Sequence, residues 1–127
     1  MGRVSIADLE GGDALCAWFG AIPSFHDSEL TELEIRQGSP SKLTAVTFRL
    51  GPEKDREGFL LATKRTAVTL HLAGLIEVEL YEFQDCGYLD GMEFDSDDEG
   101  ITISFAESAG VHGRIKARQI SVVFEPR

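Results

Sequence analysis

Basic residues are scarce in this chain. Its 12 Lys and Arg stand against 22 Asp and Glu, which gives a formal net charge of −10 at pH 7. Proteins that hold nucleic acids cluster basic side chains against the phosphates. The composition therefore argues against nucleic acid as a direct ligand and favours a partner with a basic surface.

Long apolar runs are also lacking. The most apolar stretch, residues 67–80, is interrupted by polar and charged residues such as Glu77 and Glu79. It therefore does not supply the ~20 consecutive apolar residues that a membrane-spanning helix needs. The N-terminal residues show neither a signal peptide nor a lipidation signal. We expect a cytoplasmic protein with no membrane partner.

Cysteine is rare as well. Cys16 and Cys86 lie far apart in the sequence, and neither belongs to a CxxC or Cys/His pattern. This usage is typical of two small buried side chains in a reducing compartment, although the sequence leaves open whether they approach each other.

Phosphate-binding loops, catalytic serine motifs and metal-ligand spacings are missing too. We predict no catalytic residue, no metal and no cofactor.

The length is that of one domain. The chain has 127 residues, and single soluble domains cluster at about 100–150 residues. Because no linker, repeat or low-complexity segment divides the chain, we expect residues 1–127 to form a single domain around one core.

A short helix is expected near the N-terminus. Asp13 and Gly20 bracket a short apolar segment in the order of an N-cap and a C-cap, and the helix begins at Asp13 or as early as Ser5. Its apolar face should pack on the sheet that follows, because three large side chains recur at helical spacing. These are Leu15, Trp18 and Phe19.

From about Glu29 the apolar pattern changes to a period of two, which is typical of strands with one buried face. Around Gly74 the pattern fits either one long bent strand or two strands. Each predicted strand has a set of residues that share one face. These sets are Thr44, Val46, Phe48 and Leu50; Val68, Leu70 and Leu72; Ile76, Val78 and Leu80; Ile101, Ile103 and Phe105; and Ile120, Val122 and Phe124.

Regular alternation without repeated crossover helices predicts antiparallel pairing. A single short helix is too small to cover six strands, so the strands must also cover one another. We therefore predict an α+β fold that is mainly β. It is an antiparallel curled sheet or a β-sandwich of about six strands, with the N-terminal helix closing one end.

Acidic side chains recur on the outward side of two predicted strands. Glu77, Glu79 and Tyr81 follow one another at every second residue, and Glu32 and Glu34 do so on an earlier strand. If these strands were neighbours, the like charges would repel one another, a cost that plain solvated surface does not need. Solvated polar surface is the simpler interpretation of both rows. The alternative, which assigns these residues to partner binding, is a docking face for a basic partner.

The segment Asp95–Gly100 resembles the first half of an EF-hand calcium loop, with oxygen ligands at alternate positions and glycine at the sixth. The second half does not fit, since Ala106 occupies the position of the bidentate Glu. We therefore expect a solvated hairpin turn with Gly100 at positive φ. Asp95, Asp97 and Asp98 are assigned to the predicted docking face.

His26 and Asp27 are a histidine beside a carboxylate, the combination used in acid–base chemistry. Adjacent side chains seldom face each other, however. We expect Asp27 to turn the chain into the first strand and His26 to bind backbone. An enzyme centred on this pair is the least favoured of the alternatives.

The segment Trp18–Leu30 and the pattern Leu33-Glu34-Ile35 that follows resemble the opening of the immunity protein 50 family. Pro23–Glu29 is the most specific part, and Arg118–Pro126 is similar to the family's closing strand. The resemblance implies a bacterial protein that neutralises a toxin and has no cofactor and no catalytic residue. We expect it to bind a cognate toxin domain and to act by occlusion. A toxin with a basic face would suit the negative charge.

The alternative is a non-enzymatic interaction module that assembles with copies of itself. A free edge of the sheet, or the face that carries Tyr81, would form the contact in such a homo-oligomer.

Overall fold

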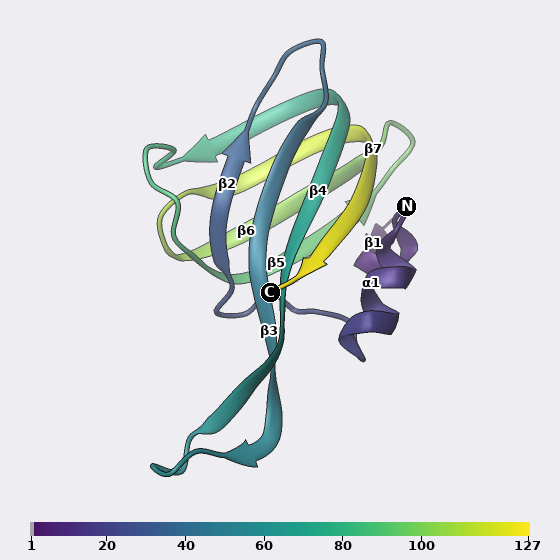
Figure 1. Cartoon of the computed structure of the whole chain (residues 1–127). Coiled ribbons are helices and arrows are strands. Elements are labelled where there is room, and N and C mark those ends of the chain that lie inside the picture. Colours follow the sequence, from purple (N-terminus) through teal and green to yellow (C-terminus); the bar gives the residue numbers. More distant parts are fainter. Residues whose placement is uncertain (1) are drawn as a thin grey trace.

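The structure is a computed structural model that describes the backbone of residues 2–127 and the side chains of all of these except residues 107–109. Its elements are ordered along the chain as follows (Figure 1). They are β1 (Gly2–Val4), the 3₁₀ helix η1 (Ile6–Asp8), α1 (Gly12–Phe19), β2 (Glu29–Glu34), β3 (Ser41–Lys54), β4 (Leu60–Tyr81), β5 (Tyr88–Ser96), β6 (Ile101–Ala109) and β7 (His112–Pro126).

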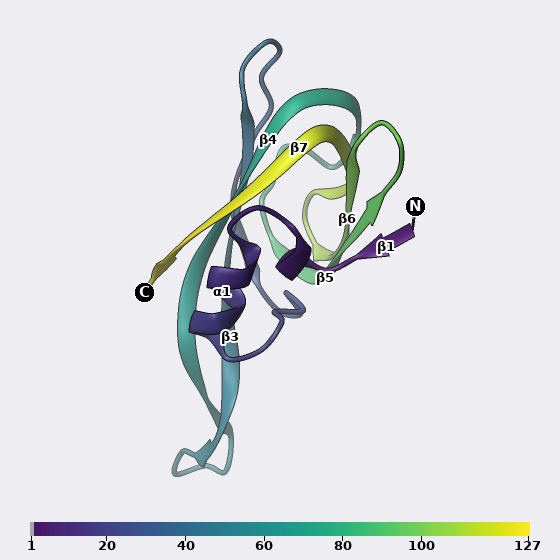
Figure 2. The ribbon, with the colours of Figure 1, turned by 90° about the vertical axis from the view of Figure 1, so that its right-hand side faces the viewer.

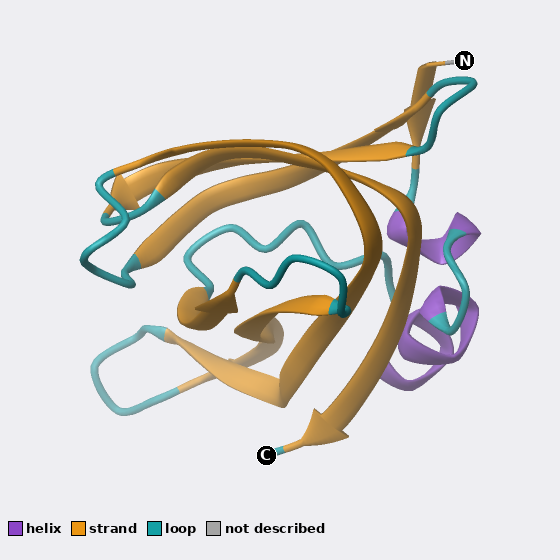
Figure 3. Cartoon of the chain, turned by 90° about the horizontal axis from the view of Figure 1, so that it is seen from above, coloured by secondary structure: helices purple, strands orange, loops and turns teal. Residues whose placement is uncertain are grey.

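All the strands belong to one antiparallel sheet in the order β1-β5-β2-β3-β4-β7-β6. Because β6 also pairs with β5, the sheet curls back on itself. It thereby forms two facing layers, which are seen edge-on in Figure 3. We call them the β2–β3 layer and the β5–β6 layer. The prediction of a mainly β, antiparallel, curled fold with one short helix is confirmed.

The long strands β4 and β7 run through both layers (Figure 1). The residues around Gly74 form one long bent strand, β4, and not two strands. Near its bend Gly74 has a φ of 70°, and the pairing with β7 shifts register between Leu75 and Glu77. A Cβ at Gly74 would lie 3.1 Å from the side chain of Arg118. Glycine therefore suits both the backbone and the space at this corner.

The core lies between the two layers. The inward sets predicted on three strands are confirmed, since their central members are buried. These are Val68, Leu70 and Leu72 on β4, Ile103 and Phe105 on β6, and Ile120 and Val122 on β7.

The face predicted for β3 is wrong, although one of its members, Val46, is buried outside the core cluster. Leu43 and Ala45 face the core, whereas Thr44 bonds to Thr69 across the outer surface, with 2.9 Å between the hydroxyl oxygens. Both sets of residues alternate with a period of two, and the period alone does not say which set is buried. Leu50 is exposed because β3 extends beyond the layers there.

The prediction for the end of β4 is wrong in one place. Val78 is exposed, whereas Leu75 and Leu80 pack against the core. The register shift after Gly74 changes which side chains reach the interior.

The sequence pattern did not predict β1 or β5. The strand β5 is interrupted by Gly91 and carries several acidic residues.

The N-terminal segment closes one end of the sheet, beside β7 (Figure 2). Ser5 begins η1, and α1 begins separately, with Gly11 rather than Asp13 as its N-cap. A Cβ on Gly12 would lie 1.7 Å from the carbonyl oxygen of Ile6, so close packing of the two turns requires glycine there. The predicted C-cap Gly20 is confirmed.

The apolar face of α1 is largely as predicted. Leu15 and Phe19 are buried, and Trp18 is half-buried and donates from Nε1 to Thr66 Oγ1 at 3.1 Å. Among the described residues, none of the helices has the length and apolar character required to cross a membrane.

Candidate functional site

The outer surface of the β5–β6 layer carries a concentration of carboxylates, which we call the acidic face. Register places Glu77 beside Lys116, Glu79 beside Arg114, and Asp95 beside Thr102. Carboxylates outnumber basic side chains on this face, because residues 66–113 contain neither Lys nor Arg. The face comprises Glu77, Glu79, Tyr81, Asp90, Glu93, Asp95, Asp97 and Glu99, together with Arg3, Arg114 and Lys116. Asp98 is exposed in the adjoining turn.

Glu79 is the centre of a fixed group of side chains. It receives the guanidinium of Arg114, with Nη2 at 3.0 Å from Oε2, and the hydroxyl of Tyr81, at 2.8 Å from Oε1. The hydrogen bond from Tyr81 and the charge of Arg114 lower the pKa of Glu79, and the bond to Glu79 raises the pKa of Tyr81. Tyr81 also stacks on His112, with ring centroids 5.4 Å apart. Its ring is therefore held in place while remaining half exposed.

Lys116 fastens the turn between β5 and β6 to β7. Its side chain is 9% exposed, and Nζ lies 2.6 Å from Asp97 Oδ2 and 2.8 Å from Glu99 Oε1. Asp97 Oδ1 also accepts the backbone N–H groups of Glu99 and Gly100. The bond from Lys116, followed by the one from Glu99, lowers the pKa of Asp97, and both carboxylates raise the pKa of Lys116.

The turn is a hairpin, as predicted, but Gly100 does not have positive φ. Glycine is needed there for another reason, since a Cβ would lie 2.2 Å from the carbonyl oxygen of Ala117. The ammonium of Lys116 occupies the two carboxylates that a calcium ion would use. Among the described residues, no group of three or more His, Cys, Asp or Glu is arranged to hold a metal ion.

The acidic face has two shallow hollows. One, of about 210 Å³, is lined by Glu77, Asp97, Thr102, Arg114 and Lys116. The other, of about 350 Å³, includes Asp90, Glu93 and Ser104 in its lining. Carboxylates and basic side chains balance in the first hollow, whereas the lining of the second has two carboxylates and no basic side chain. The second hollow is therefore the one suited to receiving basic side chains from a partner.

The predicted residues Glu32 and Glu34 lie elsewhere. They belong to β2 in the β2–β3 layer, and β3 separates them from β4, so the predicted repulsion between the two acidic rows does not arise. Glu32 forms an ion pair with Lys42 at 3.1 Å, and Glu34 forms one with Arg36. The structure thus groups Glu77, Glu79, Tyr81, Asp95 and Asp97, places Asp98 in the adjoining turn, and leaves Glu32 and Glu34 outside that group.

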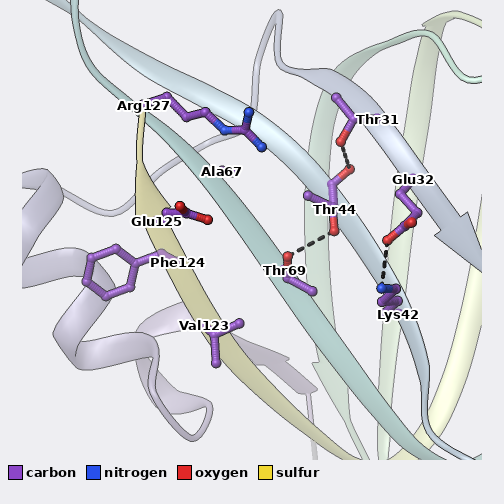
Figure 4. Close-up of a pocket in the computed structure, with 10 residues that line it drawn as sticks. All are labelled: Thr31, Glu32, Lys42, Thr44, Ala67, Thr69, Val123, Phe124, Glu125 and Arg127. Carbon is purple, nitrogen blue, oxygen red and sulfur yellow. Dashed lines mark hydrogen bonds and ion pairs between the residues drawn. The ribbon is translucent and has the colours of Figure 1, made fainter.

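Glu32 lines a groove of about 440 Å³ on the outer surface of the β2–β3 layer (Figure 4). Glu125 and the two basic side chains Lys42 and Arg127 line it as well. Carboxylates and basic groups balance here, so this groove does not share the charge of the acidic face.

Two expectations about single residues are wrong. His26 and Asp27 do meet, with Nδ1 3.2 Å from Oδ2, although both side chains are about two-thirds exposed. Positive φ at Phe25 and Asp27 turns the backbone so that neighbouring side chains converge.

The two free cysteines were both expected to be buried. Cys16 is half-buried, but Cys86 is exposed. Burial, followed by the charge of Asp13, raises the pKa of the Cys16 thiol.

Sequence reasoning missed Asp90 and Glu93 as members of the acidic face, because it did not predict β5. It also missed Arg114 and Lys116, whose positions depend on the pairing of β7 with β4 and β6. One feature of the sequence could have indicated the acidic face, namely that residues 66–113 contain no Lys or Arg.

Replacing Lys116 with methionine is expected to raise the pKa of Asp97 toward its usual value of 3.8. The pKa of Asp97 should remain below that value, because the backbone N–H groups of Glu99 and Gly100 still donate to Asp97 Oδ1. In the wild type the lowered pKa means that the ion pair stabilises the fold above pH 3.8. That stabilisation is lost as the pH falls through the lower, folded-state pKa.

A titration of the side-chain carboxyl carbons by NMR measures this change. Lys42→Met, which removes the partner of Glu32 on the other layer, is the matched control and should leave the pKa of Asp97 where it is. If Lys116→Met has no more effect than Lys42→Met, Lys116 does not hold the turn in solution.

The sequence model of one family, described as immunity protein 50, matches residues 12–124. The match therefore includes α1, β2 to β6 and nearly all of β7. No curated protein and no solved structure matches the chain.

Proposed function

Because this chain belongs to the immunity protein 50 family, we propose that it neutralises a bacterial toxin by binding the toxin domain and covering the surface with which that domain acts. Family membership assigns the chain an immunity role in general and implies a protein partner. The toxin as the partner, the acidic face as the contact surface and the cytoplasm as the place of binding are our proposal.

The observation that carries this choice of surface is the gathering of carboxylates on one side of the molecule. Arg3 pairs with Glu93 and Asp95, Arg114 pairs with Glu79, and Lys116 pairs with Asp97, so the acidic face keeps an excess of negative charge. Such a field raises the association rate of a basic partner by about 10–10³-fold at low salt. On a toxin that acts on nucleic acid, the carboxylates would occupy positions used by phosphates.

Tyr81 supports the proposal as an anchor on this face. Its ring is half exposed, yet the bond to Glu79 and the stack on His112 already restrict its rotation. A side chain that is ordered before binding loses little conformational entropy on binding. Tyrosine is also enriched among the residues that dominate binding energies.

The proposed mechanism is stoichiometric occlusion, in which the chain performs no chemistry on the toxin. Ion pairs with Arg3, Arg114 and Lys116 hold five carboxylates of the acidic face in position for contact. These are Glu79, Glu93, Asp95, Asp97 and Glu99. A toxin domain bound across them would be blocked for as long as the complex lasts, so the dissociation rate sets the degree of protection.

Co-expression tests this function. Cells that produce the toxin domain encoded beside this chain's gene are expected to survive when the chain is produced with it, and the two proteins should co-elute in size-exclusion chromatography. Cells carrying the toxin domain and an empty vector provide the control. Cell death in the presence of the chain, with separate elution of the two proteins, would overturn the proposal.

A further inference from the structure

The hairpin formed by the end of β3 and the beginning of β4 projects beyond the two layers. Figures 1 and 2 show it from two directions as a narrow extension of the body. We call residues 49–65 the β3–β4 arm. Pairing of β3 with β2 ends at Val46, and pairing of β4 with β7 begins at Thr66. Within the described chain, the two strands of the arm pair with each other.

The arm exposes large apolar side chains, which the core does not use. Leu50 is 58% exposed, Phe59 67%, Leu60 44% and Leu61 39%. Leu50 and Leu60 lie on one face of the hairpin, because Leu50 pairs with Ala62. Leu61 lies on the other face. A partner that covers these side chains has to contact both faces of the arm.

Both strand edges of the arm are poorly suited to pairing with another strand. On the β3 edge Pro52 has no N–H to donate, and the register with β4 is irregular between Leu50 and Lys54. On the β4 edge Lys64 has a φ of 54°, which breaks the extended conformation. Such features discourage strand addition, including edge-to-edge assembly with a second copy. The side chains, rather than the backbone, are therefore available for contact.

The base of the arm is fastened to α1. Arg49 Nη1 donates to the carbonyl oxygen of Phe19 at 3.2 Å, and Lys64 Nζ lies 3.8 Å from the centroid of a ring of Trp18. Trp18 is itself bonded to Thr66, at the point where β4 enters the body. These contacts fix the direction in which the arm leaves the body.

The tip of the arm is closed by its own hydrogen bonds. Asp55 N donates to the carbonyl oxygen of Phe59 at 2.8 Å, and Gly58 N donates to the carbonyl oxygen of Asp55 at 3.1 Å. Asp55 Oδ1 also accepts the backbone N–H groups of Glu57 and Phe59. An arm ordered at base and tip loses little entropy when it is bound.

We propose that the β3–β4 arm inserts into an apolar cleft of the toxin domain and contacts both walls of that cleft through Leu50, Phe59, Leu60 and Leu61. This inference rests on the proposed function. The arm carries more basic than acidic side chains, unlike the rest of the chain, so the rim of the cleft is expected to carry carboxylates. The basic residues are Arg49, Lys54, Arg56, Lys64 and Arg65, and the acidic ones are Glu53, Asp55 and Glu57.

The test replaces Leu50, Phe59 and Leu61 together with serine and measures binding to the toxin domain encoded beside this chain's gene. The affinity is expected to fall by at least about 30-fold, mainly through faster dissociation and independently of salt. The unfolding midpoint in urea should change little, because these side chains are not buried in the free chain. Trypsin should cleave after Lys54 and Arg56 in the free chain and be excluded from both sites in the complex.

The matched control is Ile22→Ser combined with Val123→Ser, two exposed apolar residues outside the arm, which should leave the affinity within about threefold. An arm variant that binds like the wild type overturns the insertion and leaves the proposed function standing. A wild-type chain that does not bind the toxin domain overturns both. A wild-type dimer that becomes monomeric in the arm variant assigns the arm to a second copy and also overturns the insertion.

Discussion

Alanine in place of Gly113 is expected to destabilise the fold by about 3 kcal/mol or more. Gly113 pairs with Leu80 on one side and Phe105 on the other, and its φ is 140°. A Cβ there would lie 2.0 Å from the carbonyl oxygen of Glu79. Backbone rather than a flexible side chain would have to move, so the pairing that positions the acidic face would open. Urea unfolding monitored by circular dichroism measures the loss.

Gly38→Ala separates the two causes of this effect. Gly38 also has positive φ, at 73°, but a Cβ would meet no atom within 4 Å. Its substitution should cost about 1 kcal/mol, from the backbone conformation alone. Equal losses for the two variants would contradict the close approach of β7 to β4 at Gly113.

Neutralising three carboxylates of the acidic face is expected to slow association with the toxin domain by about tenfold or more at low salt. The variant combines Glu77→Gln, Glu93→Gln and Asp95→Asn. Gln and Asn keep the shape of the side chains at the contact and remove mainly the long-range field, so the dissociation rate should change less than the association rate. The difference from the wild type should shrink at high salt, because screening shortens the reach of charge to a few ångströms. Surface plasmon resonance over a series of salt concentrations measures both rates.

A control with the same change in net charge is available on the other layer. It combines Glu32→Gln, Glu34→Gln and Glu125→Gln, which neutralise residues of the β2–β3 layer. The account predicts little effect on the association rate from this variant. If both variants slow association equally, net charge rather than the acidic face steers the partner.

The fold class followed from local pattern. Alternation at Val68–Leu72 and Ile120–Phe124 identified buried strand faces correctly, because large apolar residues occupy every second position and only Val123 is a large apolar residue on the other face. At β3 the same reasoning selected Val46 and Phe48 over Leu43 and Ala45. Both sets are apolar, and the choice between them depends on which face the neighbouring strands and the helix cover.

Part of the candidate site followed from spacing, and part depended on pairing between distant strands. The alternation of Glu77, Glu79 and Tyr81 placed them on one side of a strand. Their contacts with Arg114 and Lys116 depend on the register of β4 with β7, which turns and core packing far along the chain determine. The separation of Glu32 from this group depends on strand order, which the sequence pattern does not specify.

The β3–β4 arm illustrates the same limit. Its residues alternate like those of a buried strand, so the pattern predicted Leu50 to share a face with Val46. The structure exposes Leu50 because neither β2 nor β7 extends far enough to cover this part of the hairpin. Whether a strand is covered depends on the lengths of its neighbours, and these lie elsewhere in the sequence.

We propose that the chain acts by covering its partner and not by changing it. The most direct measurement adds the purified chain in steps to a fixed, micromolar amount of the toxin domain and follows the remaining toxin activity. The account predicts a linear fall that reaches zero at one chain per toxin domain, with both proteins recovered unaltered in mass. Complete inactivation by a small fraction of an equivalent, or full activity at an excess of the chain, would contradict it.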